Sequence, residues 1–211
     1  MNFNQIIVFD METGSTNPET CEVLQIAATV IDPRTLEIKS QHEFNSLIKP
    51  NNWANVEAKA LEVNKLKKED LEAAPCLPVV WRKFVEYVEK FNHNKSFYTA
   101  PIAAGANIKN FDCPIVERLS KTFGNVDKEG KSSLFNKRDR IDLLDICFLW
   151  FENHKEPENY KMDTLRDYLG LSKEGAHNAL QDVRDTAKII SRFMRFHRNI
   201  SKPSKFKGAF A

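Results

Sequence analysis

The sequence predicts an α/β fold in which a mixed sheet of five strands is flanked by helices. Two patterns predict it: β-branched and aromatic runs with turn signals fill the first quarter of the chain, and strand and helix patterns alternate after it. A chain of 211 residues, 42% hydrophobic and 28% charged, is long enough for one substantial core. We therefore expect one domain over residues 1–198, followed by a basic, flexible tail over residues 199–211.

Three strands are predicted first. Residues 6–9 are β-branched or aromatic, and a Thr-Gly-Ser turn signal follows them. Two further runs, residues 22–32 and 36–48, are separated only by Asp-Pro-Arg-Thr. Because such a short turn joins antiparallel neighbours, residues 5–48 are predicted to form a three-stranded meander.

Helices and strands alternate in the rest of the chain. Apolar residues repeat at helical spacing after a proline at position 78, and again from Ala179 to Met194. The predicted elements are helices over 78–91 and 110–123, strands over 102–104 and 140–144, a helix running on from the last strand, and a C-terminal helix. The polar segment 124–139, with two glycines, is predicted to be an exposed loop.

Composition argues against export and against membrane spanning. The N-terminus lacks a basic region followed by an apolar segment, and no apolar run approaches ~20 residues. Four scattered cysteines without CxxC spacing favour reduced thiols over zinc sites or disulfides. We therefore expect a cytoplasmic protein that does not contact membranes.

Charge is distributed unevenly along the chain. Residues 186–211 contain seven Lys or Arg and no Asp or Glu, so the formal charge of +2 for the whole chain leaves −5 for residues 1–185. A basic C-terminal face on an acidic body would attract a polyanion, and neutralising Arg192, Arg195 and Arg198 tests that hypothesis. Cations near a helix C-terminus also favour the helix dipole, and this alternative stays open.

The first acidic cluster ends the first strand. Side chains two residues apart on a strand point to the same side, so Asp10 and Glu12 should lie together at its carboxyl end. Like charges held close together repel each other, and a cation between them relieves that repulsion. A solvated acidic turn is the alternative interpretation.

Two further clusters lie at the ends of later elements. Asn107 ends a strand of small residues, and Asp112 lies in the opening turn of a helix; His177 precedes the C-terminal helix, and Asp182 lies in its first turns. Taken singly, Asp112 could favour a helix N-terminus, the histidine could cap a helix, and Asp182 could be a solvated residue. Taken together, hard oxygen ligands from separate elements and one imidazole are the groups that two-metal phosphoryl chemistry requires.

The order and spacing of these residues resemble a known family. Asp-x-Glu-Thr-Gly after a hydrophobic strand, then Asn-x-x-x-x-Asp, then His-x-x-x-x-Asp, is similar to the DEDDh branch of the DnaQ-like 3′→5′ exonucleases. The resemblance covers about residues 3–195 and includes the segments 49–75, 141–146 and 162–172. It implies a ribonuclease H-like fold, with three antiparallel strands followed by two parallel ones.

The resemblance also implies roles for individual residues. Two divalent cations, Mg²⁺ or Mn²⁺, would be held by Asp10, Glu12, Asp112 and Asp182, with Asp10 bridging both. His177 would be the general base for a water that attacks the terminal phosphodiester and releases nucleoside 5′-monophosphates. The residues expected to contact the substrate are Met11, Thr13 and Gly14 at the 3′-terminal nucleoside, Leu61 and Asn64 at the terminal bases, and Asn107.

The expected partner is the 3′ end of a single-stranded nucleic acid, and DNA and RNA both fit the motifs. Several relatives in the family are homodimers, so a homodimer is a second expectation. Residues 131–135, Lys-Ser-Ser-Leu-Phe, faintly resemble a sliding-clamp peptide, which makes a clamp or polymerase partner a weaker one. The rival interpretations are a catalytically silent nucleic-acid-binding module and a proofreading subunit that acts only with a polymerase.

Overall fold

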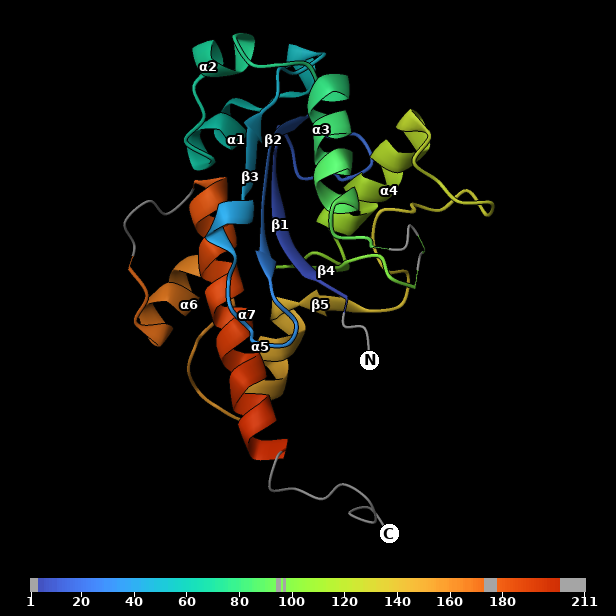
Figure 1. Ribbon diagram of the computed structural model, residues 1–211. Helices are drawn as coiled ribbons and strands as arrows, with labels where there is room; N and C mark the ends of the chain where they lie inside the picture. The colour runs from blue at the N-terminus through green and yellow to red at the C-terminus, as the bar shows by residue number, and fades with distance from the viewer. Residues whose placement is uncertain (1–3, 94–95, 97, 173–177, 202–211) are drawn as a thin grey trace.

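The centre of the structure is a mixed sheet with the strand order β3-β2-β1-β4-β5 (Figure 1). This computed structural model describes residues 4–93, 96, 98–172 and 178–201. The strands are β1 (Ile6–Thr13), β2 (Val23–Ile31), β3 (Phe44–Leu47), β4 (Ile102–Gly105) and β5 (Arg140–Asp142). β1, β2 and β3 are antiparallel neighbours, whereas β4 and β5 run parallel to β1. The predicted fold class is therefore confirmed.

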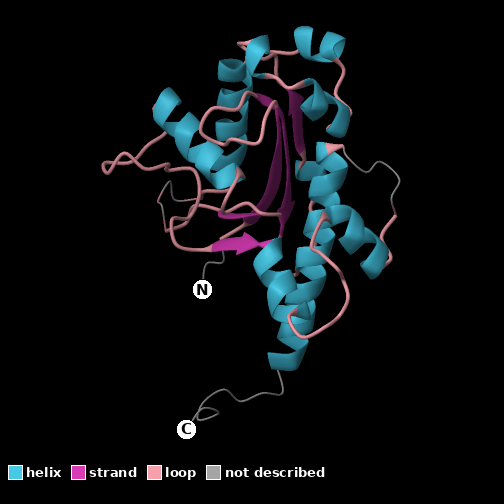
Figure 2. Cartoon of the chain, turned by 180° about the vertical axis from the view of Figure 1, so that it is seen from behind, coloured by secondary structure: helices cyan, strands magenta, loops and turns pink. Residues whose placement is uncertain are grey.

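Helices cover both faces of this sheet (Figures 1 and 2). One face packs against α3 (Leu77–Glu89) and α4 (Asp112–Phe123), and the other against α5 (Leu143–Phe151), α6 (Met162–Leu169) and α7 (Ala179–Ser201). Short helical segments lie in the connections: η1 (Ser40–His42), η2 (Trp53–Asn55), α1 (Ala58–Val63) and α2 (Lys68–Glu72). The sheet thus separates an aromatic core under α3 and α4 from a mainly aliphatic core under α7.

Alternation along β1 decides which core each of its residues joins. Ile7, Phe9 and Met11 are buried in the core under α3 and α4, whereas Ile6 and Val8 are buried in the core under α7. Successive side chains of a strand point to opposite faces. The next two residues of the second series, positions 10 and 12, therefore lie on the α7 side of the sheet.

The third strand is shorter than predicted. Residues 36–48 were expected to be extended throughout, but β3 begins only at Phe44, and a 3₁₀ turn occupies residues 40–42. Ile38 forms a single bridge with Ile31 before the chain leaves the sheet. Residues 39–43 are polar in succession, so no apolar face holds them against the core.

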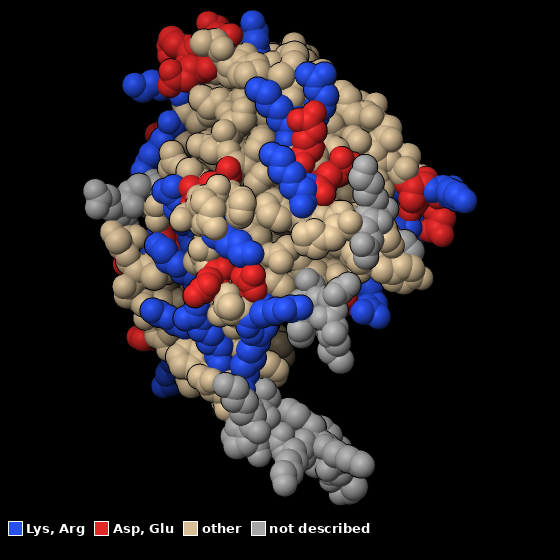
Figure 3. All heavy atoms as spheres, viewed as in Figure 1, with Lys and Arg blue, Asp and Glu red and all other residues tan. Residues whose placement is uncertain are grey.

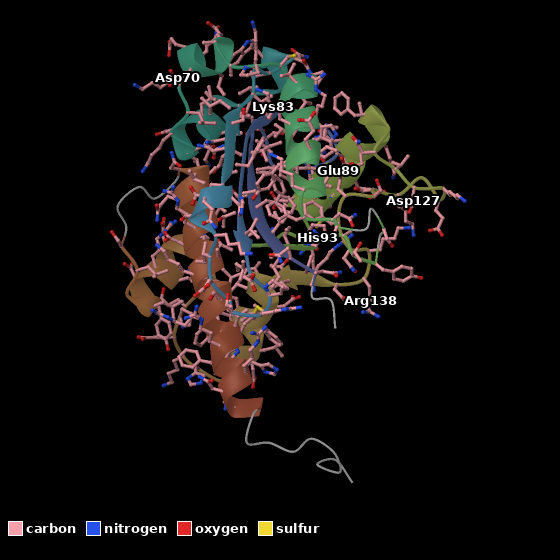
Figure 4. The ribbon with its side chains drawn as sticks, viewed as in Figure 1. Asp70, Lys83, Glu89, His93, Asp127 and Arg138 are labelled. Carbon is pink, nitrogen blue, oxygen red and sulfur yellow. The ribbon has the colours of Figure 1, made fainter. Side chains whose placement is uncertain are left out.

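The connection between α4 and β5 is less exposed than predicted. Leu134 and Phe135 are only 3% and 7% exposed, and the Phe135 ring stacks on Phe9 with centroids 5.1 Å apart. Asp127 and Arg138 lie on the outer part of this connection (Figure 4), where Lys137 forms an ion pair with Asp127. The two apolar residues that suggested a clamp-binding peptide are therefore core residues.

The other helix predictions agree with the structure to within two residues at most ends. The C-terminal helix α7 continues to Ser201, three residues into the segment predicted as a tail, and residues 202–211 lie outside the described part. None of the described helices is both long and apolar enough to span a membrane.

Candidate active site

Two acidic side chains lie at the carboxyl end of β1. Asp10 and Glu12 are partly buried on the α7 side of the sheet. Antiparallel pairing fixes both, because Asp10 lies opposite Ala27 and Glu12 opposite Gln25 on β2. The predicted shared orientation of the two carboxyl groups is therefore a direct result of strand geometry.

A third carboxyl group approaches β1 from the edge that faces β4, opposite its edge with β2. β4 ends at Gly105, so the part of β1 beyond Phe9 has no parallel neighbour there. The Asp112 carboxylate takes that place, and its Oδ1 accepts a hydrogen bond from the Met11 N–H at 2.9 Å. A Cβ atom on Gly105 would lie 2.8 Å from the Phe9 carbonyl oxygen, so this close approach requires glycine. Asp112 itself is only 2% exposed.

The fourth predicted ligand lies in the first turns of α7. The Asn178 side chain accepts the Leu180 N–H at 3.1 Å, as an N-cap residue does, and the helix then presents Asp182 one turn later. Arg166 of α6 donates from Nη2 to Asp182 Oδ1 at 2.6 Å. The same guanidinium donates from Nε to Asp185 Oδ2 at 3.0 Å, and its side chain is fully buried.

Burial and mutual repulsion raise the pKa values of the carboxyl groups at the end of β1. Burial, and then the charge of Asp182, raise the pKa of Asp10 from 3.8 to about 7. Burial, then Asp10 and Asp182, raise the pKa of Glu12 from 4.5 to about 8. The pKa of Asp112 is also raised, chiefly by burial and by Asp10, although the Met11 N–H lowers it. The four predicted acids therefore lie close enough to interact electrostatically.

The segment that follows β1 and helix α1 meet above this strand end. Gly14 packs so closely on residues 55–57 that an added Cβ atom would lie 2.9 Å from the Asn55 carbonyl oxygen. Asn64 donates from Nδ2 to the Thr13 carbonyl oxygen at 3.2 Å, and Leu61 is partly buried one turn earlier in α1. The structure thus brings Asn64 to Thr13 and Gly14, which lie about fifty positions earlier in the chain.

The remaining predicted residues are placed differently. The Met11 side chain is buried in the aromatic core, so its main chain is the part that faces Asp112. Asn107 is exposed with φ of 58°, and its N–H donates to Asp142 Oδ1 at 3.0 Å, which makes it a turn residue. His177 lies outside the described residues. Contacts of these residues with a substrate stay predictions.

Arg166 is the residue that the sequence analysis missed. It continues a helical stripe with Met162, Leu165 and Leu169, all buried or partly buried. A charged residue at such a position needs buried partners, because an unpaired charge away from water is costly. That signal in α6, together with two aspartates three residues apart in α7, could have identified the ion-pair cluster.

The donor set fits a hard divalent cation in its chemistry. Mg²⁺ and Mn²⁺ prefer carboxylate oxygens, and Asp10, Glu12 and Asp112 supply them with no cationic side chain paired to any of the three among the described residues. In that same part of the chain, no three His, Cys, Asp or Glu side chains are already arranged around one ion position.

Comparison with known proteins places the chain in a family. The family model RNase_T, described as exonuclease, matches residues 7–190. Among curated proteins, Protein NEN2 from Arabidopsis thaliana is 27% identical over 192 residues, which are 89% of this chain and 34% of that protein. DNA polymerase III PolC-type from Thermotoga maritima is 25% identical over 92% of this chain. This chain spans only about a third of the first relative and 12% of the second.

Three solved structures that share the fold are described as nucleases. E. coli Exonuclease I in complex with a dT13 oligonucleotide superposes with a TM-score of 0.74 at 15% identity, over 95% of this chain and 43% of that one. Cell-death related nuclease 4 gives a TM-score of 0.70 at 19% identity, over 92% of this chain and 64% of that one. A 3′-exonuclease that recognises the histone mRNA stem-loop gives 0.67 at 13% identity, over 93% and 84%. At these identities the likeness shows the ribonuclease H-like fold.

Proposed function

Because the chain belongs to the RNase_T exonuclease family, we propose that it is a 3′→5′ exonuclease that depends on divalent cations. It would hydrolyse the terminal phosphodiester of single-stranded DNA or RNA and release nucleoside 5′-monophosphates. The observation that carries the proposal is the group of carboxyl groups at the end of β1, whose pKa values rise chiefly because they are buried and also because neighbouring acids repel their charge. Such groups are typical of functional sites in clefts.

Four residues are proposed to hold Mg²⁺ or Mn²⁺: Asp10, Glu12, Asp112 and Asp182. Bound divalent cations supply charge neutralisation at the phosphate and a water molecule of lowered pKa. The Met11 N–H orients Asp112, and Arg166 orients Asp182, so neither carboxylate has to be ordered when the substrate arrives. His177 is proposed to take the proton of the attacking water.

Selection for a 3′ end would come from the enclosure above β1. Gly14 packs against Asn55 and Val56 just before α1, and Asn64 just after α1 donates to the Thr13 carbonyl group. A terminal nucleoside is proposed to lie there, with its 3′-hydroxyl near Thr13 and its base against Leu61. Recognition of a chain end in this way requires no readout of base edges, so sequence preference is expected to be weak.

The direct test is digestion of matched 5′-labelled single-stranded DNA and RNA with Mg²⁺ or Mn²⁺, beside EDTA. Asp10→Asn is the test variant, and Asp70→Asn, an exposed aspartate on α2 (Figure 4), is the matched control. The proposal predicts a ladder that shortens from the 3′ end in the wild type and in the control, and no ladder with EDTA or Asp10→Asn. Tight binding of both strands without turnover would contradict it and favour a silent binding module.

Similarity to a PolC-type DNA polymerase favours one alternative function. The alignment covers 92% of this chain but only 12% of that polymerase. A proofreading subunit that acts with a separate polymerase is therefore the second candidate. Activity that appears on DNA only after addition of a polymerase, and never on RNA, would favour it over the independent enzyme.

A further inference from the structure

One face of α7 carries a line of cationic side chains. Arg184, Lys188, Arg192 and Arg195 follow one another at intervals of three or four residues, so they share a face of the helix. The line begins half a turn after Asp182 and leads away from the acidic site. Figure 3 shows Lys and Arg gathered over the lower half of α7 and the adjoining β2–β3 connection.

The first two cations of the line have acidic partners. Arg184 donates to both carboxylate oxygens of Glu43 at 2.8 and 2.7 Å. Lys188 donates from Nζ to Asp185 Oδ1 at 3.0 Å. Positive charge near the acidic site is therefore largely balanced within the fold.

The next two cations have no acidic partner among the described residues. Arg192 forms no ion pair or hydrogen bond with any residue in the ranges that the structure describes. Arg195 donates from Nη2 to the Leu36 carbonyl oxygen at 3.0 Å, which is a neutral partner. The positive potential of α7 is consequently concentrated one to two turns beyond Lys188.

These two arginines line a hollow. It has a volume of about 620 Å³ and lies between α7 and residues 36–41 of the β2–β3 connection. Lys39, which forms an ion pair with Asp32, and Lys188 also line it, and Glu37 is the one acidic residue among its described lining residues. A concave, basic surface of this size fits a flexible polyanion better than it fits a flat partner.

Exposed aromatic rings lie beside the arginines. Phe196 follows Arg192 by one turn of α7 and is 51% exposed. Its ring lies 6.2 Å from the ring of Trp150 on α5, which is 37% exposed. Phe196 lines a small apolar recess of about 40 Å³. Lys188 and Arg192 line both this recess and the basic hollow. Cationic and aromatic side chains thus adjoin on one surface.

We infer that this surface, which we call the α7 track (Trp150, Lys188, Arg192, Arg195 and Phe196), binds the single-stranded part of the nucleic acid that lies 5′ of the nucleotide being removed. Phosphates would contact the two arginines, and bases would stack on Phe196 and Trp150, which is the arrangement that proteins use for single strands without sequence preference. The inference rests on the proposed function, because it names how the same substrate is held beyond the site.

Helix geometry sets the length of strand that the α7 track requires. Asp182 and Phe196 are fourteen residues apart, which is about 21 Å at the helical rise of ~1.5 Å per residue. A stacked strand covers that distance in about six nucleotides at ~3.4 Å each, and an extended strand covers it in fewer. Arg192 is ten residues from Asp182, or about 15 Å by the same rise, so short oligonucleotides should reach the acidic site without reaching Arg192 or Phe196.

The test measures binding of 5′-labelled oligonucleotides of about three and about twelve nucleotides. Fluorescence anisotropy reports the binding, in EDTA and over a range of salt concentrations. EDTA prevents cation-dependent hydrolysis, so binding is measured whether or not the chain is an enzyme. The variants are Arg192→Glu and Phe196→Ala. Arg82→Glu, an exposed arginine on α3, matches the charge change, and Phe196→Trp keeps an aromatic ring.

The inference predicts that Arg192→Glu weakens binding of the long strand about tenfold at low salt and flattens its salt dependence. Phe196→Ala should weaken it about fivefold or more, whereas Phe196→Trp should retain affinity. Arg82→Glu should change nothing, and binding of the short strand should be the same for all variants.

Unchanged affinity for the long strand in Arg192→Glu and Phe196→Ala would overturn the inference, as would an equal loss in Arg82→Glu. If those variants instead lower the mass measured by light scattering, or abolish binding to vesicles of anionic lipid while oligonucleotide affinity is unchanged, the surface serves a second copy or a membrane. Failure of the proposed function is separate, because it would appear as absent digestion with Mg²⁺ or Mn²⁺ while these binding results still hold.

Discussion

Two groups of carboxylates lie on the same side of the sheet. They differ in whether the chain supplies cationic side chains to neutralise their charge. At the end of β1, Asp10 and Glu12 have no cationic partner among the described residues, and burial raises the pKa of both. Along α7, burial also raises the pKa of Asp185, but hydrogen bonds from Lys188, Arg166 and other donors outweigh it and leave that pKa below its ordinary value. Asp182 belongs to both groups, since it repels Asp10 and contacts Arg166.

The difference separates a functional cluster from a structural one. Carboxylates that the chain neutralises itself depend on their partner, because its loss leaves an uncompensated buried charge. Carboxylates that the chain leaves without a cation weaken the fold until a cation arrives from solution. Substitutions in the two groups should therefore affect stability in opposite directions and activity to different extents.

Removal of one charge from the unpaired group should have the largest effect on activity. Asp10→Asn is expected to lower the rate of 3′-end hydrolysis by about a thousandfold or more, because lost electrostatic stabilisation of this kind costs roughly 10²–10³ per group and Asp10 is proposed to serve both ions. Single-turnover digestion with saturating Mn²⁺ measures this rate. A loss of less than about tenfold would place the chemistry elsewhere.

Removal of the shared cation should have the largest effect on stability. Arg166→Met is expected to lower the free energy of unfolding by about 3–5 kcal/mol, because it leaves Asp185, with a side chain only 2% exposed, without its buried partner. Urea unfolding followed by circular dichroism measures the change. A variant as stable as the wild type would mean that Asp185 and Asp182 are solvated.

The pH dependence of stability should distinguish the two groups next. In EDTA, the folded chain keeps protons on Asp10 and Glu12 up to about pH 7 and pH 8, whereas the unfolded chain loses them near pH 3.8 and 4.5. Between these limits the folded state binds more protons, so the free energy of unfolding must fall as pH rises from about 4 to about 8.

The double variant Asp10→Asn plus Glu12→Gln removes both titrating groups. Its free energy of unfolding should therefore fall less than that of the wild type over the same pH range in EDTA. Urea unfolding at several pH values compares the two chains, and parallel profiles would show that neither carboxyl group has a raised pKa.

The smallest effect is expected at the exposed partner of Asp185. Lys188 is 51% exposed in its side chain, so Lys188→Met should cost less than about 1 kcal/mol of stability, as exposed ion pairs usually do. The same urea titration used for Arg166→Met measures it. A loss equal to that of Arg166→Met would mean that Lys188, and not the buried guanidinium, balances Asp185.

Local patterns predicted much of the fold and part of the site. Strand period placed Asp10 and Glu12 on one side of β1, because that period depends only on neighbouring residues. The hydrogen bond from Met11 to Asp112 joins residues 101 positions apart and depends on where β4 ends. No local pattern contains that information, and the ribonuclease H-like resemblance supplied it only as a role for Asp112.

Two further differences come from isolated residues in misleading surroundings. Leu134 and Phe135 lie in a polar segment, so composition indicated an exposed loop, but packing in the core under α3 and α4 buries them. Arg166 lies in an amphipathic helix, where arginine is usually exposed, but acidic residues of α7 draw it inward. In both cases tertiary contacts decide the burial of single side chains against the composition around them.

Thermal unfolding tests most directly whether the carboxylates at the end of β1 weaken the fold until a cation binds. The wild type and Asp10→Asn are compared, first in EDTA and then with increasing Mn²⁺. Above about pH 8 in EDTA, where the carboxyl groups at the end of β1 ionise, Asp10→Asn is expected to be the more stable chain, because it removes a buried charge and its repulsion with the neighbouring acids. Mn²⁺ is also expected to stabilise the wild type, by about 2.7 kcal/mol at a hundred times the dissociation constant, and to stabilise Asp10→Asn less. A wild type that is the more stable chain in EDTA and gains nothing from Mn²⁺ would contradict the account.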